Sequence, residues 1–245
     1  MFDPIVGSKT HFMGPLVNGD LGTSLSYDDG SGAEFWTPVK SQTLRRAALT
    51  LGHHMCRGCG FKSRKYQEVL APNGQVWALD QMQVVCIFCA GVKCIDLVAP
   101  QRSGVALYLP EWSQKKLVVV AKAIYVARIS QGPIADQARE LLDLFMHRRR
   151  RAEKIVGGEA TANALLQHQR AMGPDDVEAG GLRVWPLDRR IIKEADLEFN
   201  QFPQILAYWR SKDGPFGSIA PPTWDPDAFM PYLTKMRAAS PLYQS

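Results

Sequence analysis

The sequence predicts an α+β fold in which a small metal-binding ββα core precedes a mainly α-helical C-terminal portion. Two CxxC pairs, Cys56 with Cys59 and Cys86 with Cys89, enclose about 26 residues that include strand-like runs. Beyond about residue 130, apolar side chains instead recur at helical spacing. The cysteine spacing matches a tetrahedral four-cysteine zinc site. We therefore expect one structural zinc ion bound by Cys56, Cys59, Cys86 and Cys89.

The alternatives for these four cysteines are buried thiols or a redox pair, but two complete CxxC units favour zinc. Cys94 is flanked by apolar residues, and we expect it to be a small buried side chain outside the metal site. His53 and His54 are close to Cys56 in the sequence, yet the two CxxC units already supply four ligands. Such a zinc ion has no open position for a water molecule, and hydrolysis by the metal is not expected.

A β-hairpin is predicted between the two CxxC pairs, with strands at 66–70 and 75–79. The turn at 71–74 contains Asn73 and Gly74, which readily adopt the positive φ angles of a tight reversal. An isolated hairpin is marginally stable in water. A zinc ion that holds both flanks would contribute about 10–16 kcal/mol of apparent binding free energy to folding.

The metal-binding core is predicted to span 38–130, after an irregular Gly-rich N-terminal arm at 1–37 with one possible strand at 23–27. Its first helix, at 38–51, carries Leu44, Ala47, Ala48 and Leu51 on one face and ends near Gly52. After the second CxxC pair, residues 92–98 form a strand or a short helix and 104–109 a strand. Ser113 is the expected N-cap of a helix at 117–129, whose apolar circumference predicts burial against the hairpin sheet.

A helical portion at 131–212 and a Pro-rich C-terminal tail at 213–245 follow the core. One helix is expected to begin at Gly132 and Pro133 and to continue through four arginines to Gly157. Further expectations are a helix at 159–172, an extended piece at 182–187, and helical spacing at 189–210 that Pro203 interrupts. In the irregular tail, the predicted docking anchors are Phe216, Trp224, Phe229 and Tyr232.

The four arginines Arg148, Arg149, Arg150 and Arg151 are a candidate partner-binding cluster. Consecutive residues cover a whole helical turn, so at least one arginine faces the apolar side and needs an acceptor or a path to solvent. A solvated helix end, an acidic protein partner and a nucleic acid are the three interpretations of the run.

Composition and charge are those of a globular protein without a membrane span. The 245 residues carry a formal net charge of +5, a pI near 9.0 and a mean hydropathy of −0.17. The sequence contains no run of about 18 uncharged apolar residues and no basic-then-apolar secretory signal. We therefore expect a cytoplasmic protein, in which paired cysteines bind metal instead of forming disulfides. The small positive excess permits an acidic partner but does not identify one.

A hairpin framed by two CxxC pairs and followed by a helix resembles the zinc-braced ββα nucleases of the HNH family. Their reaction needs a histidine base on the first strand, an asparagine before the second cysteine pair and a histidine after it. This sequence has Gln67 and Glu68 at the first place, Gln81 at the second and Ala90 at the third. We therefore expect no nuclease activity.

Three stretches carry a more specific resemblance, to the IcmJ/DotN family of type IVB secretion systems and related conjugative plasmids. They are CRGCGFKSRKYQEV at 56–69, CIFCA at 86–90 and LYLPEWS at 107–113. The resemblance extends from about 43 to 128 and weakens towards 212, so it does not cover the N-terminal arm or the Pro-rich tail. It implies a zinc-containing, HNH-like fold without nuclease activity.

The resemblance further implies an adaptor subunit of the coupling complex that binds the C-terminal extension of the type IV coupling ATPase and contacts other coupling-complex subunits. Such a protein is cytoplasmic and peripheral to the inner membrane, which it reaches only through the ATPase. Nucleic acid is not an expected partner. We expect the arginine cluster and exposed apolar positions of the C-terminal helices to receive a helical, partly acidic segment.

Two other functions remain as alternatives. The first is an active HNH-type nuclease, which would have to use carboxylates such as Glu68, Asp80 and Asp96 in place of histidines. The second is a zinc module that binds nucleic acid without cleaving it, with affinity that falls steeply as salt rises. The predicted hairpin offers only Tyr66 and Trp77 for base stacking, which is few for such a surface.

Overall fold

The computed structural model describes residues 36–72, 78–99, 104–172, 179–186, 201–217 and 227–239. Within these ranges the fold is α+β, with small antiparallel sheets and several helices, as predicted. No helix in the described ranges is long and apolar enough to cross a membrane. Several predicted features lie outside them: the strand at 23–27, Asn73 and Gly74 of the turn, Trp77, Trp224 and the helical spacing at 189–200.

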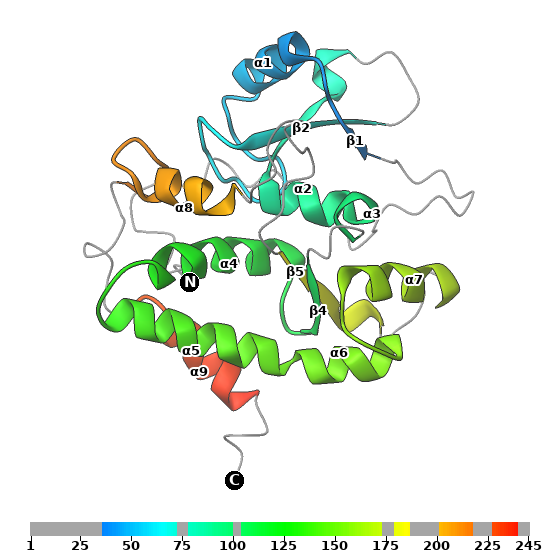
Figure 1. Ribbon diagram of the computed structural model, residues 1–245, viewed down its shortest axis with the longest axis vertical. Helices are drawn as coiled ribbons and strands as arrows, with labels where there is room; N and C mark the ends of the chain where they lie inside the picture. The colour runs from blue at the N-terminus through cyan, green and yellow to red at the C-terminus, as the bar shows by residue number, and fades with distance from the viewer. Residues whose placement is uncertain are drawn as a thin grey trace.

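A three-stranded antiparallel sheet forms one end of the molecule (Figure 1). Its strands are β1 (Trp36–Pro38), β2 (Gln67–Pro72) and β3 (Gln83–Cys86), with β2 in the centre. Helix α1 (Gln42–Leu51) covers this sheet. It ends at Gly52 as predicted, but it begins after the N-cap Ser41 and not at 38, because Pro38 belongs to β1. A small apolar core lies between them, made of Val39, Ala48, Val69, Ala71, Met82 and Val84.

Of the second hairpin strand predicted at 75–79, residues 75–77 lie outside the described residues, and residues 78 and 79 are not in a strand. The strand that pairs with β2 is β3, with Gln67 opposite Cys86 and Leu70 opposite Gln83. Leu79 belongs instead to a short 3₁₀ helix, η2 (Leu79–Gln81). Val84 and Val85 are buried in β3, directly before Cys86. The arm predicted as irregular at 1–37 is also wrong at its end, because Trp36 and Thr37 belong to strand β1.

Helix α4 (Gln114–Arg128) is the central buried helix of the fold. Ser113 caps it, because its Oγ accepts a hydrogen bond of 3.2 Å from the backbone N–H of Lys116. Figure 1 shows α4 between α8 (Phe202–Arg210) and α2 (Ile87–Lys93) on one side and α5 (Pro133–His147) on the other. The helix therefore packs mainly against other helices and a second sheet, and not against the hairpin sheet as the sequence suggested.

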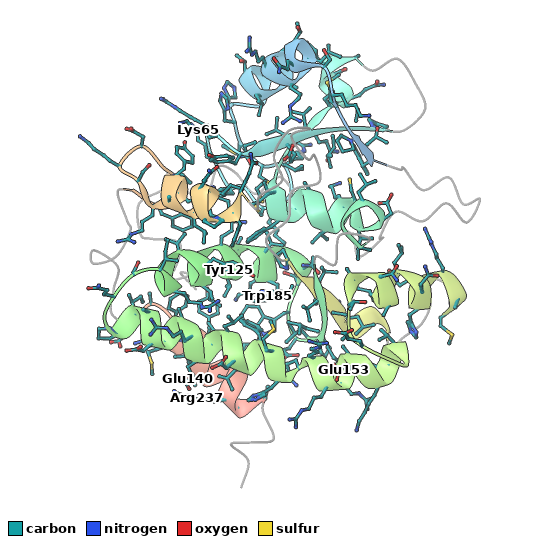
Figure 2. All side chains as sticks on the ribbon, in the orientation of Figure 1. Lys65, Tyr125, Glu140, Glu153, Trp185 and Arg237 are labelled. Atoms are coloured by element: carbon teal, nitrogen blue, oxygen red, sulfur yellow. The ribbon has the colours of Figure 1, made fainter. Side chains whose placement is uncertain are left out.

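The second sheet pairs β4 (Val105–Tyr108) with β5 (Leu182–Trp185) in antiparallel register. The free edge of β5 is satisfied by Gln114, whose side-chain amide donates to the Val184 carbonyl and accepts from the Val184 N–H, both at 2.8 Å. Figure 2 shows Trp185 beside Tyr125 of α4, and the indole Nε1 donates a hydrogen bond of 3.1 Å to the Tyr125 hydroxyl. Both strands were predicted, but their pairing was not.

Replacing Gln114 with alanine should destabilise the fold by roughly 2–4 kcal/mol, because two buried backbone groups of Val184 lose their partners. Urea denaturation followed by circular dichroism measures this loss. The matched control is Lys115→Ala on the next residue of α4, which should change stability by less than about 0.5 kcal/mol. Equal stabilities of the two variants would show that Gln114 does not hold the edge of β5.

The predicted long helix after Gly132 is divided at Arg148 into α5 and α6 (Arg149–Val156), so the prediction of a single helix is wrong. The Arg148 carbonyl accepts a hydrogen bond of 3.4 Å from the Tyr108 N–H of β4. The Arg148 carbonyl at the break between the two helices is thus a hydrogen-bond partner of strand β4. Gly157 ends α6 in the left-handed conformation, with φ of 71°, as its position in the sequence suggests.

Three further helices complete the described fold: α3 (Ile95–Val98), α7 (Ala162–Met172) and α9 (Met230–Ala238). In α8, Pro203 lies in the first turn and therefore begins the helix instead of interrupting it. Helix α9 lies within the tail predicted as irregular, and its Arg237 donates to Glu140 of α5 at 2.7 Å (Figure 2). Three predicted docking anchors of the tail are buried: Phe216, Phe229 and Tyr232.

Candidate metal centre

The first CxxC pair forms a tight turn between α1 and β2. The Cys56 N–H donates to the Phe61 carbonyl at 2.9 Å, and the Gly60 N–H donates to the Cys56 carbonyl at 2.8 Å. Gly60 has φ of 76°, a conformation that glycine adopts without steric cost. The turn therefore brings Cys56 and Cys59 to the same side of the backbone.

The second CxxC pair spans the junction between β3 and α2. Cys86 is the last residue of β3 and also the N-cap of α2, where its Sγ accepts from the Cys89 N–H at 3.5 Å. Cys89 lies in the first helical turn, and the sulfurs of Cys86 and Cys89 lie within 4.8 Å of those of the first CxxC pair. Because β3 leads directly into Cys86, the pairing of β2 with β3 sets the position of this ligand pair.

The structure brings the four predicted cysteines together. All four sulfurs lie within 4.8 Å of one another, and Cys59 Sγ and Cys86 Sγ are 3.7 Å apart. Zinc–sulfur bonds of about 2.3 Å in a tetrahedron require sulfurs separated by roughly 3.8 Å. Three of the cysteines are buried and Cys59 is half-buried. The cluster therefore has the donors, spacing and enclosure that a metal ion needs.

A buried lysine, Lys122 of α4, lies against this cluster and was not predicted. Its Nζ is 3.2 Å from Cys59 Sγ and 3.7 Å from Cys86 Sγ. Burial alone would lower the pKa of Lys122, but the charges of the cysteine sulfurs, Cys59 first, raise it above the usual value. An ammonium at this position can donate hydrogen bonds to both sulfurs. The signal in the sequence was a single charged residue within the apolar run at 117–127.

The four thiols differ in acidity. Hydrogen bonds from Cys56, Cys86 and Cys89 lower the pKa of Cys59 well below that of an ordinary thiol. Burial raises the pKa of Cys86, but hydrogen bonds from neighbouring thiols outweigh it and the net pKa is lowered. The pKa values of Cys56, through burial, and Cys89, through its hydrogen bonds with the other cysteines, are raised. The charge of Lys122 also lowers the pKa of Cys59. A bound metal ion would supply positive charge for all four sulfurs.

The residues at the position of a nuclease base instead support the cluster. The Gln67 side chain donates to the His54 and Phe61 carbonyls, both at 3.0 Å, and so ties β2 to the first CxxC turn. Glu68 is fully buried and forms an ion pair of 3.2 Å with Arg45 of α1. Both side chains are thus engaged within the fold.

The other candidate residues of a nuclease site do not gather around a second metal position. Gln81 of η2 accepts a hydrogen bond from the Ala78 N–H at 3.2 Å, and Ala90 is buried in α2. Asp80 is exposed in η2 and Asp96 is half-buried in α3. Among the described residues, the four cysteines are the group of metal-ligating side chains close enough to share an ion.

The fifth cysteine and the nearby histidines lie outside the cluster, as predicted. Cys94 is buried, its Sγ donates to the Trp36 carbonyl at 3.3 Å, and burial raises its pKa to about 12. His53 and His54 both have positive φ angles and form the turn after α1.

The four arginines do not form one continuous patch. Arg148 pairs with Glu111, and Arg149 pairs with Glu153 at 2.9 Å and with Glu159 at 2.8 Å. Arg150 is exposed on α6, and the exposed Arg151 lies 5.6 Å from the centre of the Tyr108 ring. Arg150 and Arg151 are therefore the members of the cluster that face outwards.

An apolar groove of about 520 Å³ lies elsewhere, between the end of α4 and α8. Figure 1 shows α8 and α6 on opposite sides of the molecule, so the arginines do not border this groove. The expected combination of apolar surface and arginine edge is thus not found at this groove. Its lining includes Ile129, Phe202, Pro203, Leu206, Ala207 and Arg210.

Comparison with known proteins gives one relevant similarity. The chain is 25% identical over 117 residues to the Type 4 apparatus protein DotN of Legionella pneumophila, a match that covers 46% of this chain and 54% of DotN. The chain thus spans about half the length of this curated relative. No model of a known protein family matches the chain. The similarity makes the chain a distant relative of DotN and supports the IcmJ/DotN resemblance of its cysteine-containing motifs.

Proposed function

We propose that this protein is a non-catalytic, zinc-stabilised subunit of a type IV secretion or conjugation coupling complex, in which it binds the C-terminal extension of the coupling ATPase. The observation that carries the proposal is the enclosed four-cysteine cluster in a chain similar to DotN. A site with four thiolate ligands stabilises a fold and offers no open position for substrate.

Zinc is the proposed ion because four thiolates in a tetrahedron suit its softness and lack of geometric preference. Strands β2 and β3 and helix α2 follow one another in ββα order, which is consistent with the proposed HNH-like core. The absence of nuclease activity is supported by Gln67 and Glu68, whose side chains bond within the fold at the position of the base. Zinc would then act on stability alone.

The proposed contact with the ATPase extension is electrostatic and involves Arg150 and Arg151. Both side chains are exposed on α6. Arg148 and Arg149 already pair with carboxylates of the chain and contribute less to a partner. An acidic segment of the extension would place its carboxylates against the outward-facing pair.

Reversing both outward-facing charges, Arg150→Glu with Arg151→Glu, should weaken binding of the ATPase extension about tenfold or more at low salt. Fluorescence anisotropy with the labelled extension measures the affinity. The control pair Arg46→Glu with Arg128→Glu changes the net charge equally at exposed sites on other helices, and should leave binding within about threefold.

A third variant, Ala207→Arg, fills the separate groove at α8 and should not affect binding. If only that variant loses affinity, the interface lies at α8 and not at α6. No binding of the extension to the unaltered chain would show that the proposed function is wrong.

A further inference from the structure

Lys122 is enclosed by the metal site and by aromatic rings. The side chain is 2% exposed although it belongs to the central helix α4. Beyond the two sulfurs already described, Nζ lies 5.0 Å from the centre of the Phe61 ring and 5.9 Å from that of Phe88. Ring faces attract a cation, so both aromatics help to hold the ammonium in place.

No carboxylate among the described residues forms an ion pair with this ammonium; the contacts of Nζ are two sulfurs and two rings. An ammonium that is buried without a partner costs several kcal/mol, so its counter-charge must be nearby. Four thiolates around a divalent ion leave a formal charge of about −2 on the cluster. The lysine and the cluster therefore compensate each other.

We propose that Lys122 is a positioning residue of the metal site: its ammonium partly neutralises the four-thiolate cluster, holds Cys59 and Cys86 in the ligand position, and sets how tightly the metal is retained. The inference rests on the proposed zinc site and adds a residue outside the ligand set. Hydrogen bonds from outer groups to ligands commonly change metal affinity by about 10–100-fold. The same bonds reduce the electron density available on the two sulfurs, so oxidants and alkylating agents should release the ion slowly.

Lys122→Met removes the charge and keeps the length of the side chain. Zinc affinity, measured by competition with a chromophoric chelator, should fall at least about tenfold, and alkylation with iodoacetamide should release zinc faster. Lys122→Arg keeps the charge and should stay within about threefold of the original affinity. The control Val120→Ala removes buried volume from the same helix, and should lower thermal stability while leaving zinc affinity nearly unchanged.

A wild-type zinc affinity and release rate in Lys122→Met would overturn the proposal. If Lys122→Met does not fold, Lys122→Gln takes its place as a neutral variant that still donates a hydrogen bond. If both neutral variants fail to fold in excess zinc while Lys122→Arg folds, the result supports a role for the positive charge of Lys122. Failure of all three shows that side-chain shape accounts for the lysine, and the proposal is then wrong. An unaltered chain that purifies without zinc contradicts the metal site itself.

Discussion

Replacing Cys86 with serine should abolish zinc binding and unfold the region formed by β2, β3 and α2. Cys86 is fully buried at the junction of β3 and α2, and its sulfur lies 3.7 Å from that of Cys59. A serine hydroxyl is a poor zinc ligand because it does not ionise near neutral pH. A structural zinc ion would contribute about 10–16 kcal/mol of apparent binding free energy, which is comparable to or larger than the net stability of most domains.

Elemental analysis and thermal unfolding by circular dichroism measure the two parts of this result. Limited proteolysis should locate the first cleavages within 56–93 in the Cys86→Ser variant. The matched control is Cys94→Ser, a buried thiol outside the cluster whose replacement can keep the hydrogen bond to the Trp36 carbonyl. It should retain zinc and lose less than about 2 kcal/mol. Retention of zinc by Cys86→Ser would contradict the assignment of this ligand.

The gathering of the four cysteines could be predicted, because each CxxC pair places two sulfurs on one turn and needs few distant contacts. The partner strand of β2 could not, because 75–79 and 83–86 are both rich in strand-forming residues. Tertiary structure decides between them. When Gln67 pairs with Cys86, β3 ends at Cys86 and α2 begins there. This arrangement places the second cysteine pair beside the first.

Two other features depend on residues far apart in the sequence. At the break, the Arg148 carbonyl accepts a hydrogen bond from the N–H of Tyr108, 40 residues earlier. The apolar periodicity of the helix does not reveal such a distant contact. Lys122 left a clearer signal, since a lysine within the apolar run at 117–127 needs a partner once it is buried. Its partner, however, could be named only once α4 was placed beside the cysteine cluster.

The metal region and the C-terminal helices form a continuous apolar core. Trp209 of α8 is fully buried and forms edge contacts with Phe61, at 5.2 Å between ring centres, and with Phe88, at 5.8 Å. Phe61 follows the first CxxC pair and Phe88 lies within the second. The two rings that contact Trp209 therefore belong to the same turns that hold the ligands, so the seating of α8 and the geometry of the metal site should depend on each other.

Replacing Trp209 with alanine should therefore destabilise the protein by about 3–5 kcal/mol, because the cavity would lie between α8 and both cysteine turns. Urea denaturation measures the loss, and hydrogen exchange should show α8 losing protection first. Trp209→Phe is the matched control: the indole Nε1 has no hydrogen-bond partner among the described residues, so a phenyl ring keeps most of the contacts. That variant should lose less than half as much stability. Equal losses in the two variants would mean that α8 depends on the full indole and not on aromatic packing against Phe61 and Phe88.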